Sequence, residues 1–537
     1  MTRLLYIIAL FGITSSLLLS QQTGGEQEPV NTEPASFPNA IIIGDYNPET
    51  GGGTKKLPQK PKPMNQSSLD SLNDNEKQKF LLLPPEKIPA NFELPTFPNA
   101  YLEASFGSFI TPRGMAGIDF DIDNFNFFAN GGYESSAGHI ENAEYSKIIA
   151  NADIDYIAPE KFWLFGGSKT RTKFRFFNDG FNNYAADSSN LESINTNNIA
   201  LGTQTESNYN GFRFNSNLGF NLLSIADNSD DGTEFGINAG LGLLNPFGTD
   251  AIGLNGELSY RTTNGNGNSL FLANGVFPIA KGDISFTVEP GLQFSDNTIG
   301  GGKVAFYANI ELAMQMSDYF TMYARANTGL EDNSLTDMYA LNPYISSSPI
   351  IEFKHTIAKG ELIFNYHPYT FVSVVFGASY ELNDTDIAMT NDSSTFRFSP
   401  TYVGSNRIRA FAQLFYDITD MSRITSDFAL NITSQDSTDE QMTYVPVVEF
   451  ATNYHYNFTK EFGTVIGVSY IGNRYADLAN TLELDGYFNV NLKAEYYFSE
   501  SLGAFVNFEN ILNQDIFIWN GYRQRGIFAQ LGVLYTF

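Results

Sequence analysis

Apolar and polar residues alternate along the chain from Asn99 to Phe537. Between Ile118 and Asp123, apolar and acidic residues alternate without exception, and Phe125 resumes the pattern after a two-residue turn. A period of two places successive side chains on opposite faces of a β-strand. The same alternation recurs in residues 212–222, 304–316, 372–382 and 488–498. The pattern therefore predicts one continuous all-β region over residues 99–537.

Two architectures produce this alternation. A soluble β-sandwich has a core face and a water face, whereas an outer-membrane barrel has a lipid face and a lumen face. The alternating segments run for about 10 to 15 residues, which is longer than an ordinary strand and suits a tilted membrane strand. Aromatic residues such as Phe125, Tyr319 and Phe498 gather near the predicted strand ends, as in an aromatic girdle. We therefore predict a transmembrane up-and-down antiparallel β-barrel.

The predicted connections alternate between short turns and long polar loops. In outer-membrane barrels, short turns face the periplasm and long loops face the cell surface. Tracing this alternation predicts about 22 strands, within a range of 16 to 22, with both ends of the barrel in the periplasm. The predicted long loops cover residues 135–143, 179–196, 332–348, 384–393, 435–442 and 511–522.

The N-terminal segments differ from the barrel region. Residues 1–20 carry Arg3 followed by an apolar stretch and read as a signal peptide. Residues 21–98 begin with Gln21 and are rich in proline, so they predict an extended periplasmic leader that cannot bury a core of its own. Two apolar islands, 40–43 and 80–83, suit either packing on the rest of the protein or docking on a partner. Residues 99–537 form the predicted outer-membrane barrel.

Composition narrows the function. The formal net charge is −28, which excludes a nucleic-acid partner, because a phosphate backbone would be repelled. The chain has no cysteine, which excludes disulfides and thiolate chemistry. The four histidines, including His139, show no metal-ligand spacing. We therefore predict no catalytic residue, no cofactor and no metal site, and we expect that the protein is not an enzyme.

The last strand carries a distinct pattern. Leu531, Val533, Tyr535 and Phe537 fall on one face of the terminal segment. A terminal aromatic residue with apolar residues at every second position resembles the C-terminal signal that the barrel-assembly machinery reads. The resemblance implies that this machinery is a partner during insertion, because an exposed edge strand can pair with another sheet.

The stretch before the last strand contains a characteristic set of residues, Asn510, Asn513, Trp519, Gly521, Tyr522 and Gly526. In this order they resemble the end of TonB-dependent receptor barrels of the Bacteroidetes type. The specific match covers residues 505–537, and it implies an outer-membrane barrel with a role in transport. Members of that family carry a globular plug before the barrel, and residues 21–98 are too few and too rich in proline for one. We therefore expect a plugless barrel.

These features predict a protein of the outer membrane of a Gram-negative bacterium, in contact with outer-membrane lipid. The first functional hypothesis is a pore or transport component for small solutes, with a polar lumen that favours neutral or cationic solutes. The alternative is a non-conducting structural or assembly subunit of an outer-membrane complex, with a periplasmic or surface lipoprotein as partner.

Overall fold

The structure, a computed structural model, describes residues 100–537 except 162–165, 187–189, 210, 229–230, 248–249 and 299. The predicted signal peptide and leader lie outside the described residues. The described residues contain no helix that is long and apolar enough to cross a membrane.

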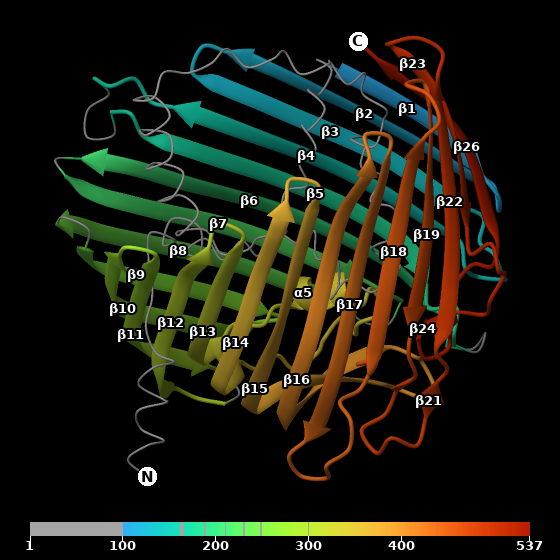
Figure 1. Cartoon of the computed structure of the whole chain (residues 1–537). Coiled ribbons are helices and arrows are strands. Elements are labelled where there is room, and N and C mark those ends of the chain that lie inside the picture. Colours follow the sequence, from blue (N-terminus) through green and yellow to red (C-terminus); the bar gives the residue numbers. More distant parts are fainter. Residues whose placement is uncertain are drawn as a thin grey trace, which may run out of the picture.

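Twenty-two strands form one closed antiparallel sheet, which confirms the predicted barrel and its strand number. Each strand pairs with its neighbours in sequence, so the strands follow one another around the wall (Figure 1). The first strand closes the barrel against the last, in a register that runs from Tyr101 opposite Thr536 to Gly107 opposite Gln530. The C-terminal strand therefore completes the wall and leaves the sheet without an open edge.

The first thirteen strands of the sheet are β1 Ala100–Gly107, β2 Thr111–Ile122, β3 Phe125–Ser136, β4 Tyr145–Ile157, β5 Lys169–Asn182, β6 Ser193–Tyr209, β7 Phe212–Ala226, β8 Asp231–Phe247, β9 Asp250–Thr263, β10 Asn266–Lys281, β11 Ile284–Asn297, β12 Lys303–Ser317 and β13 Phe320–Glu331. The other nine are β14 Lys354–Tyr369, β15 Val372–Asn391, β16 Phe398–Thr419, β17 Ser422–Gln435, β18 Val448–Asn457, β19 Phe462–Ile471, β22 Tyr487–Tyr497, β23 Leu502–Glu509 and β26 Phe528–Thr536. The long loops contain the helix α5 Leu335–Leu341 and the short strands β20 Arg474–Tyr475, β21 Glu483–Leu484, β24 Phe517–Trp519 and β25 Tyr522–Arg523.

The two faces of the wall differ in polarity. The outer face is apolar, and Leu254 on β9 leaves 69 % of its surface exposed there. The inner face is polar, and Asn274 on β10 and Glu103 on β1 are buried in it. Lipid is the solvent that favours an exposed apolar surface of this extent, whereas a water-soluble protein would bury it. The alternation in the sequence therefore distinguishes the residues that face lipid from those that face the lumen.

Exposed aromatic side chains mark the end of the barrel that carries the short turns. Phe125, Tyr319 and Phe498 lie there on the outer surface, as an aromatic girdle requires. Two other aromatic residues, Phe177 on β5 and Tyr323 on β13, face the lumen instead and are packed in its hydrophobic clusters. The girdle is therefore real, but the aromatic residues near strand ends divide between the two faces.

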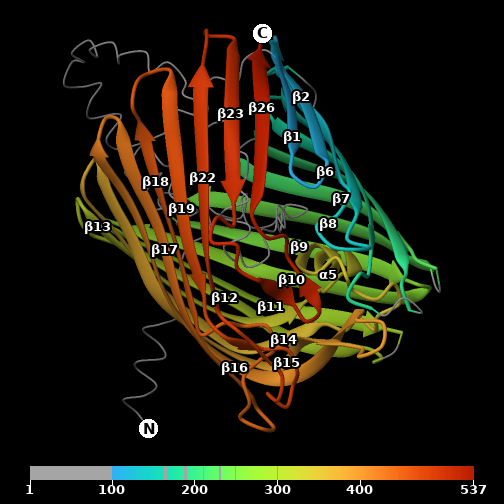
Figure 2. The same cartoon turned by 90° about the vertical axis from the view of Figure 1, so that its right-hand side faces the viewer.

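The predicted long loops lie at the opposite end of the barrel, whereas the connection between β4 and β5, residues 158–168, belongs to the end with the short turns. Residues 332–353, which connect β13 to β14, form the longest connection and contain α5. Both views place α5 within the ring of strands (Figures 1 and 2). The predicted loop at 384–393 is wrong, because β15 and β16 continue as a paired hairpin until a short loop at 392–397.

Candidate functional site

The long loops share one hydrophobic cluster with the inner wall. In α5, Leu335, Met338 and Tyr339 are buried against lumen-facing residues of β6 and β7, such as Ile194 and Leu223. Because those two residues face the lumen, the loop folds into the barrel rather than away from it. Six loops contribute to the cluster, and we call their described residues together the lid: 183–186 with 190–192, 332–353, 392–397, 436–447, 472–486 and 510–527.

Aromatic rings join the loops of the lid. Tyr522 is fully buried and stacks on Tyr344, with ring centroids 3.4 Å apart. Trp519 packs between Phe398 and Tyr444 at centroid distances of 5.2 and 4.7 Å. Aromatic pairs contribute roughly 0.5–1.5 kcal/mol beyond the area that they bury. The last loop is thereby held against segments that are distant in the sequence.

A buried carboxylate holds the start of α5 to the wall. Glu234 on β8 is fully buried and accepts hydrogen bonds from the backbone N–H groups of Leu335 at 2.6 Å and Thr336 at 3.2 Å. Arg261 on β9 pairs with Glu234 at 3.3 Å and with Asp332 at 2.9 Å. A carboxylate at a helix N-terminus satisfies otherwise unpaired N–H groups and complements the helix dipole. The loop 332–353 is therefore held at one defined position on the inner wall, against β8 and β9.

The buried guanidinium of Arg397 joins the loop 392–397 to three other loops at the same end of the barrel. Arg397, at the end of the loop 392–397, lies 3.5 Å from a carboxylate oxygen of Glu192 and 3.5 Å from one of Asp227. Its Nη2 donates a hydrogen bond to the carbonyl of Ile345 at 2.5 Å. Removing one partner of a buried ion pair is costly, because it leaves an uncompensated charge. Arg397 is therefore a residue on which closure of the lid depends.

The structure places the residues that resemble the receptor family in the last long loop. Asn510 and Asn513 adopt positive φ angles of 47° and 51°, and Gly521 adopts 85°. The side chain of Asn510 donates to the carbonyls of Gln514 and Arg525 at 2.9 and 3.2 Å. Trp519 and Tyr522 enter the lid, and Gly526 follows at the end of the loop. These residues shape a compact loop, which their spacing alone did not reveal.

The four residues of the predicted assembly signal share one face of β26, as expected. That face is the outer one, and Phe537 leaves 68 % of its surface exposed. The rings of Tyr535 and Phe537 lie edge to face with centroids 4.8 Å apart. Leu531 and Val533 lie on the same outer surface. Their recognition by the assembly machinery stays a prediction.

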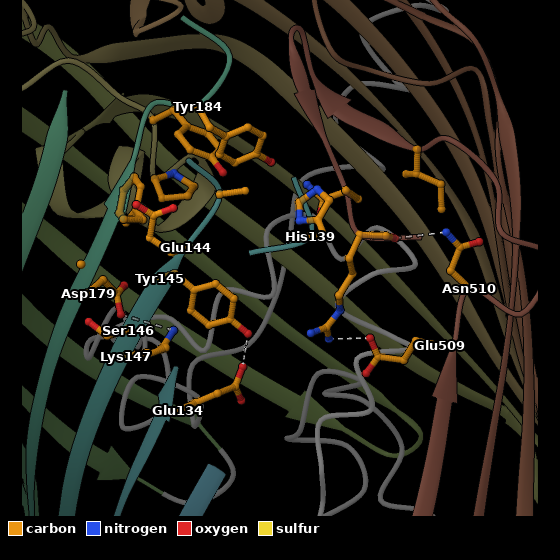
Figure 3. Close-up of a pocket in the computed structure, with 18 of the residues that line it drawn as sticks. Glu134, His139, Glu144, Tyr145, Ser146, Lys147, Asp179, Tyr184, Glu509 and Asn510 are labelled. Atoms are coloured by element: carbon orange, nitrogen blue, oxygen red, sulfur yellow. Dashed lines mark hydrogen bonds and ion pairs between the residues drawn. The ribbon is translucent and has the colours of Figure 1, made fainter. Parts of the chain in front are cut away.

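A cavity of about 380 Å³ lies beside the lid, between β3 to β5 on one side and β22 and β23 on the other (Figure 3). Its lining combines tyrosine rings, amides and carboxylates. The residues that bound it include Glu134, His139, Glu144, Tyr145, Lys147, Asp179, Tyr184, Tyr344, Asn489, Asn491, Glu509, Asn510 and Arg525.

Charged groups of the cavity are mostly paired with one another. Glu509, labelled in Figure 3, lies 2.6 Å from Arg525. The guanidinium of Arg525 packs on the ring of Phe528, with its central carbon 3.8 Å from the ring centroid. Glu134 accepts a 2.5 Å hydrogen bond from the hydroxyl of Tyr145. These contacts connect the two sides of the cavity to the wall and fix the orientation of the side chains.

His139 is neutral in this setting. Its Nε2 donates to the backbone carbonyl of Arg523 at 2.7 Å, and the Tyr184 hydroxyl donates to the same oxygen at 2.9 Å. Burial lowers the pKa of His139, so the ring carries no charge at pH 7. The histidine therefore supports the lid and adds no positive charge to the cavity.

The sequence contained part of the signal for this site. Alternation in residues 488–498 predicts that Asn489 and Asn491 face the same side, which the structure confirms as the lumen side. It could not predict that they face β4 and β5, because that juxtaposition depends on closure of the whole barrel. Asp179 and Tyr344 fell within stretches expected to be surface loops, so their burial beside the lumen was missed.

No family model matches the chain, and no curated protein matches it in sequence. Solved structures match its fold. The ferric-catecholate import receptor Fiu of Escherichia coli K12 is 10 % identical, with 82 % of each chain covered and a TM-score of 0.61. The FrpB iron transporter of Neisseria meningitidis is 10 % identical, with 82 % of this chain and 81 % of that chain covered and a TM-score of 0.63. The siderophore receptor PirA of Acinetobacter baumannii is 12 % identical, with 82 % and 80 % covered and a TM-score of 0.61. The chain therefore has the closed 22-strand barrel fold of TonB-dependent receptors of the outer membrane.

Proposed function

We propose that this chain is a plugless transport barrel of the outer membrane whose surface end is closed by its own loops. The observation that carries the proposal is the lid, which joins six loops of the surface end to the inner wall in one buried cluster. A polar lumen wall supports passage of water-soluble solutes, as in other outer-membrane channels. The lid takes the place of a constriction at the surface end.

Transport also agrees with what the structural neighbours are said to do. The three neighbours named above are an import receptor for ferric catecholates, an iron transporter and a siderophore receptor. The likeness supports the fold, and the direction and cargo of transport are separate questions. The alternative function, a non-conducting assembly subunit, is supported by the same closure of the surface end.

Conductance of the purified protein in planar bilayers distinguishes the two functions. We expect small or rare currents from the wild type and larger steady currents after replacement of residues 334–346 by a short glycine-serine linker. Arg397→Gln should also raise the conductance, because it removes the buried cation that lies 3.5 Å from both Glu192 and Asp227. The matched control is Arg171→Gln, which breaks a largely exposed pair with Asp155 in the lumen and should change little.

Insertion must be checked for each variant by heat-modifiable migration on gels. A barrel in which residues 334–346 are replaced, and which inserts normally but conducts no current, would contradict the transport proposal. It would leave the assembly subunit as the better explanation.

A further inference from the structure

We propose that the cavity beside the lid binds a small organic cation, with an ammonium group toward Asp179 and a neutral hydroxyl or amide group toward Asn489 and Asn491. The proposal names a solute class for the transport barrel and in that sense rests on the proposed function. Its evidence, however, concerns binding at one site and can be tested without transport.

Two buried amides first indicate a missing ligand group. Asn489 and Asn491 on β22 line the cavity, and each leaves only 6 % of its surface exposed. The Oδ1 of Asn491 accepts the backbone N–H of Asn510 at 2.9 Å, and its Nδ2 has no hydrogen-bond partner among the described residues. The Oδ1 of Asn489 likewise has no partner in the described part of the chain.

Such atoms need an explanation. Leaving a buried donor or acceptor unpaired costs about 1–3 kcal/mol, and folded proteins contain few of them. One unpaired donor and one unpaired acceptor on the same strand face match a hydroxyl or an amide, since each of these groups both donates and accepts. A ligand that carries such a group would satisfy both asparagines.

A carboxylate on the opposite side of the cavity is also incompletely satisfied. Asp179 on β5 accepts a hydrogen bond from the Tyr339 hydroxyl through Oδ2 at 3.1 Å. Its Oδ1 has no hydrogen-bond donor within the described residues, and Lys147 approaches it only to 3.9 Å (Figure 3). The Lys147 side chain is 54 % exposed, so it can turn toward water. An ammonium group would supply the strong donor that Asp179 lacks.

The balance of charge favours a cation. The lining has four carboxylates, Glu134, Glu144, Asp179 and Glu509, and two cations, Lys147 and Arg525. With His139 neutral, four negative and two positive charges leave a formal charge of −2. An anionic solute would be repelled more strongly here than in water, because a partly buried site screens charge less. The lining also includes the rings of Tyr145, Tyr184 and Tyr344, and aromatic rings attract organic cations.

Three probes of the same length test the ligand class. The full-length barrel in detergent is titrated calorimetrically with 6-aminohexan-1-ol, 1,6-hexanediol and 6-hydroxyhexanoate. These differ only in whether one end is an ammonium, a hydroxyl or a carboxylate. We expect the amino alcohol to bind about tenfold more tightly than the diol, and the hydroxyacid to bind least.

Variants then locate the site. Asp179→Asn should weaken binding of the amino alcohol about tenfold and leave binding of the diol nearly unchanged. The control Asp155→Asn makes the same change of charge on β4, at a residue that does not line the cavity, and should change binding less than twofold. Asn489→Ala should weaken the amino alcohol and the diol alike. Asn489→Ala leaves the hydrogen bond between Asp179 and Tyr339 intact. It therefore tests the site even if Asp179→Asn disturbs the lid.

Several outcomes would overturn the proposal. Equal binding of diol and amino alcohol would assign the cavity to neutral solutes, and tighter binding of the hydroxyacid would assign it to anions. Absence of binding by all three probes would remove the site. If the barrel with residues 334–346 replaced conducts but no probe binds to the full-length barrel, the ligand class is wrong and the transport function stands. If the amino alcohol binds but no barrel conducts, the transport function is wrong and the binding site stands.

Discussion

Single residues decide how tightly the lid can close. Gly521 has a φ of 85°, and a Cβ there would lie 2.7 Å from the ring of Phe396 and 2.8 Å from Cβ of Ala185. We expect Gly521→Ala to destabilise the closed lid by about 1–3 kcal/mol through crowding, in addition to the backbone strain. Hydrogen exchange in residues 510–527 should accelerate by about 5- to 150-fold, because local opening becomes more frequent.

The chain offers a matched control for this substitution. Gly211, in the turn between β6 and β7, has the same φ of 85°, but nothing lies within 4 Å of the position of its Cβ. Gly211→Ala therefore imposes the same backbone strain without crowding. Equal acceleration of exchange in residues 510–527 by both variants would show that the contacts of Gly521 with Phe396 and Ala185 do not hold the lid closed.

Much at the residue scale could be predicted from local sequence, and the rest depended on distant contacts. Alternation placed Leu531 and Phe537 on one face, which the structure confirms, because strand geometry is local. The stacking of Tyr522 on Tyr344 could not be predicted, because it joins two loops that approach each other only after the barrel has closed. The same holds for Glu234 and the N-terminus of α5.

At the scale of elements, β26 both closes the wall and ends the chain. It pairs with β1 and with β23, and its outer face exposes Tyr535 and Phe537. If these rings form the assembly signal, replacing both by Ser should leave most of the chain degraded in the periplasm. Quantification of the protein in outer-membrane fractions measures this effect.

Inward-facing positions of the same strand provide the control. Gln530 and Thr536 lie on the lumen side of β26, so Gln530→Ser together with Thr536→Ser changes two residues without touching the outer face. This pair should leave the amount of inserted protein near that of the wild type. Normal insertion of the Tyr535→Ser, Phe537→Ser variant would refute the signal.

The existence of strands was easier to predict than their ends. Alternation of period two predicted about 22 membrane strands, the number in the structure, because lipid and lumen impose opposite polarity on successive residues. The hairpin of β15 and β16 extends beyond this region to Asn391 and Phe398, where the inner face packs into the cluster of the lid through Met389 and Phe398. Lipid no longer requires an apolar outer face there, so the alternation fades. Residues 384–393 were therefore mistaken for a loop. The helix α5 was also missed, since a helix of seven residues leaves a weak pattern.

At the scale of the whole molecule, a barrel of 22 strands encloses a wide lumen. Barrels of 16–18 strands already hold aqueous channels, and 22-stranded barrels are normally plugged. The lid lies at the end of the long loops, and β1 begins at Ala100 at the opposite end. We therefore expect the predicted leader, residues 21–98, to join the barrel at its periplasmic mouth. We expect residues 80–98 to lie in or across that mouth, as a second seal in series with the lid.

Two seals in series make a specific prediction, because the narrower one limits the current. Deleting residues 23–90 should raise conductance only slightly while the lid is intact. In the barrel that also lacks residues 334–346, the same deletion should raise both single-channel conductance and the antibiotic sensitivity of cells.

A control that replaces residues 23–90 by a glycine-serine segment of equal length separates a specific seal from mere chain volume, since a flexible segment lacks the apolar residues 80–83 and the prolines. If the well-inserted double deletion conducts no better than the lid deletion alone, the leader does not close the mouth. Closure would then require a separate subunit at the periplasmic side.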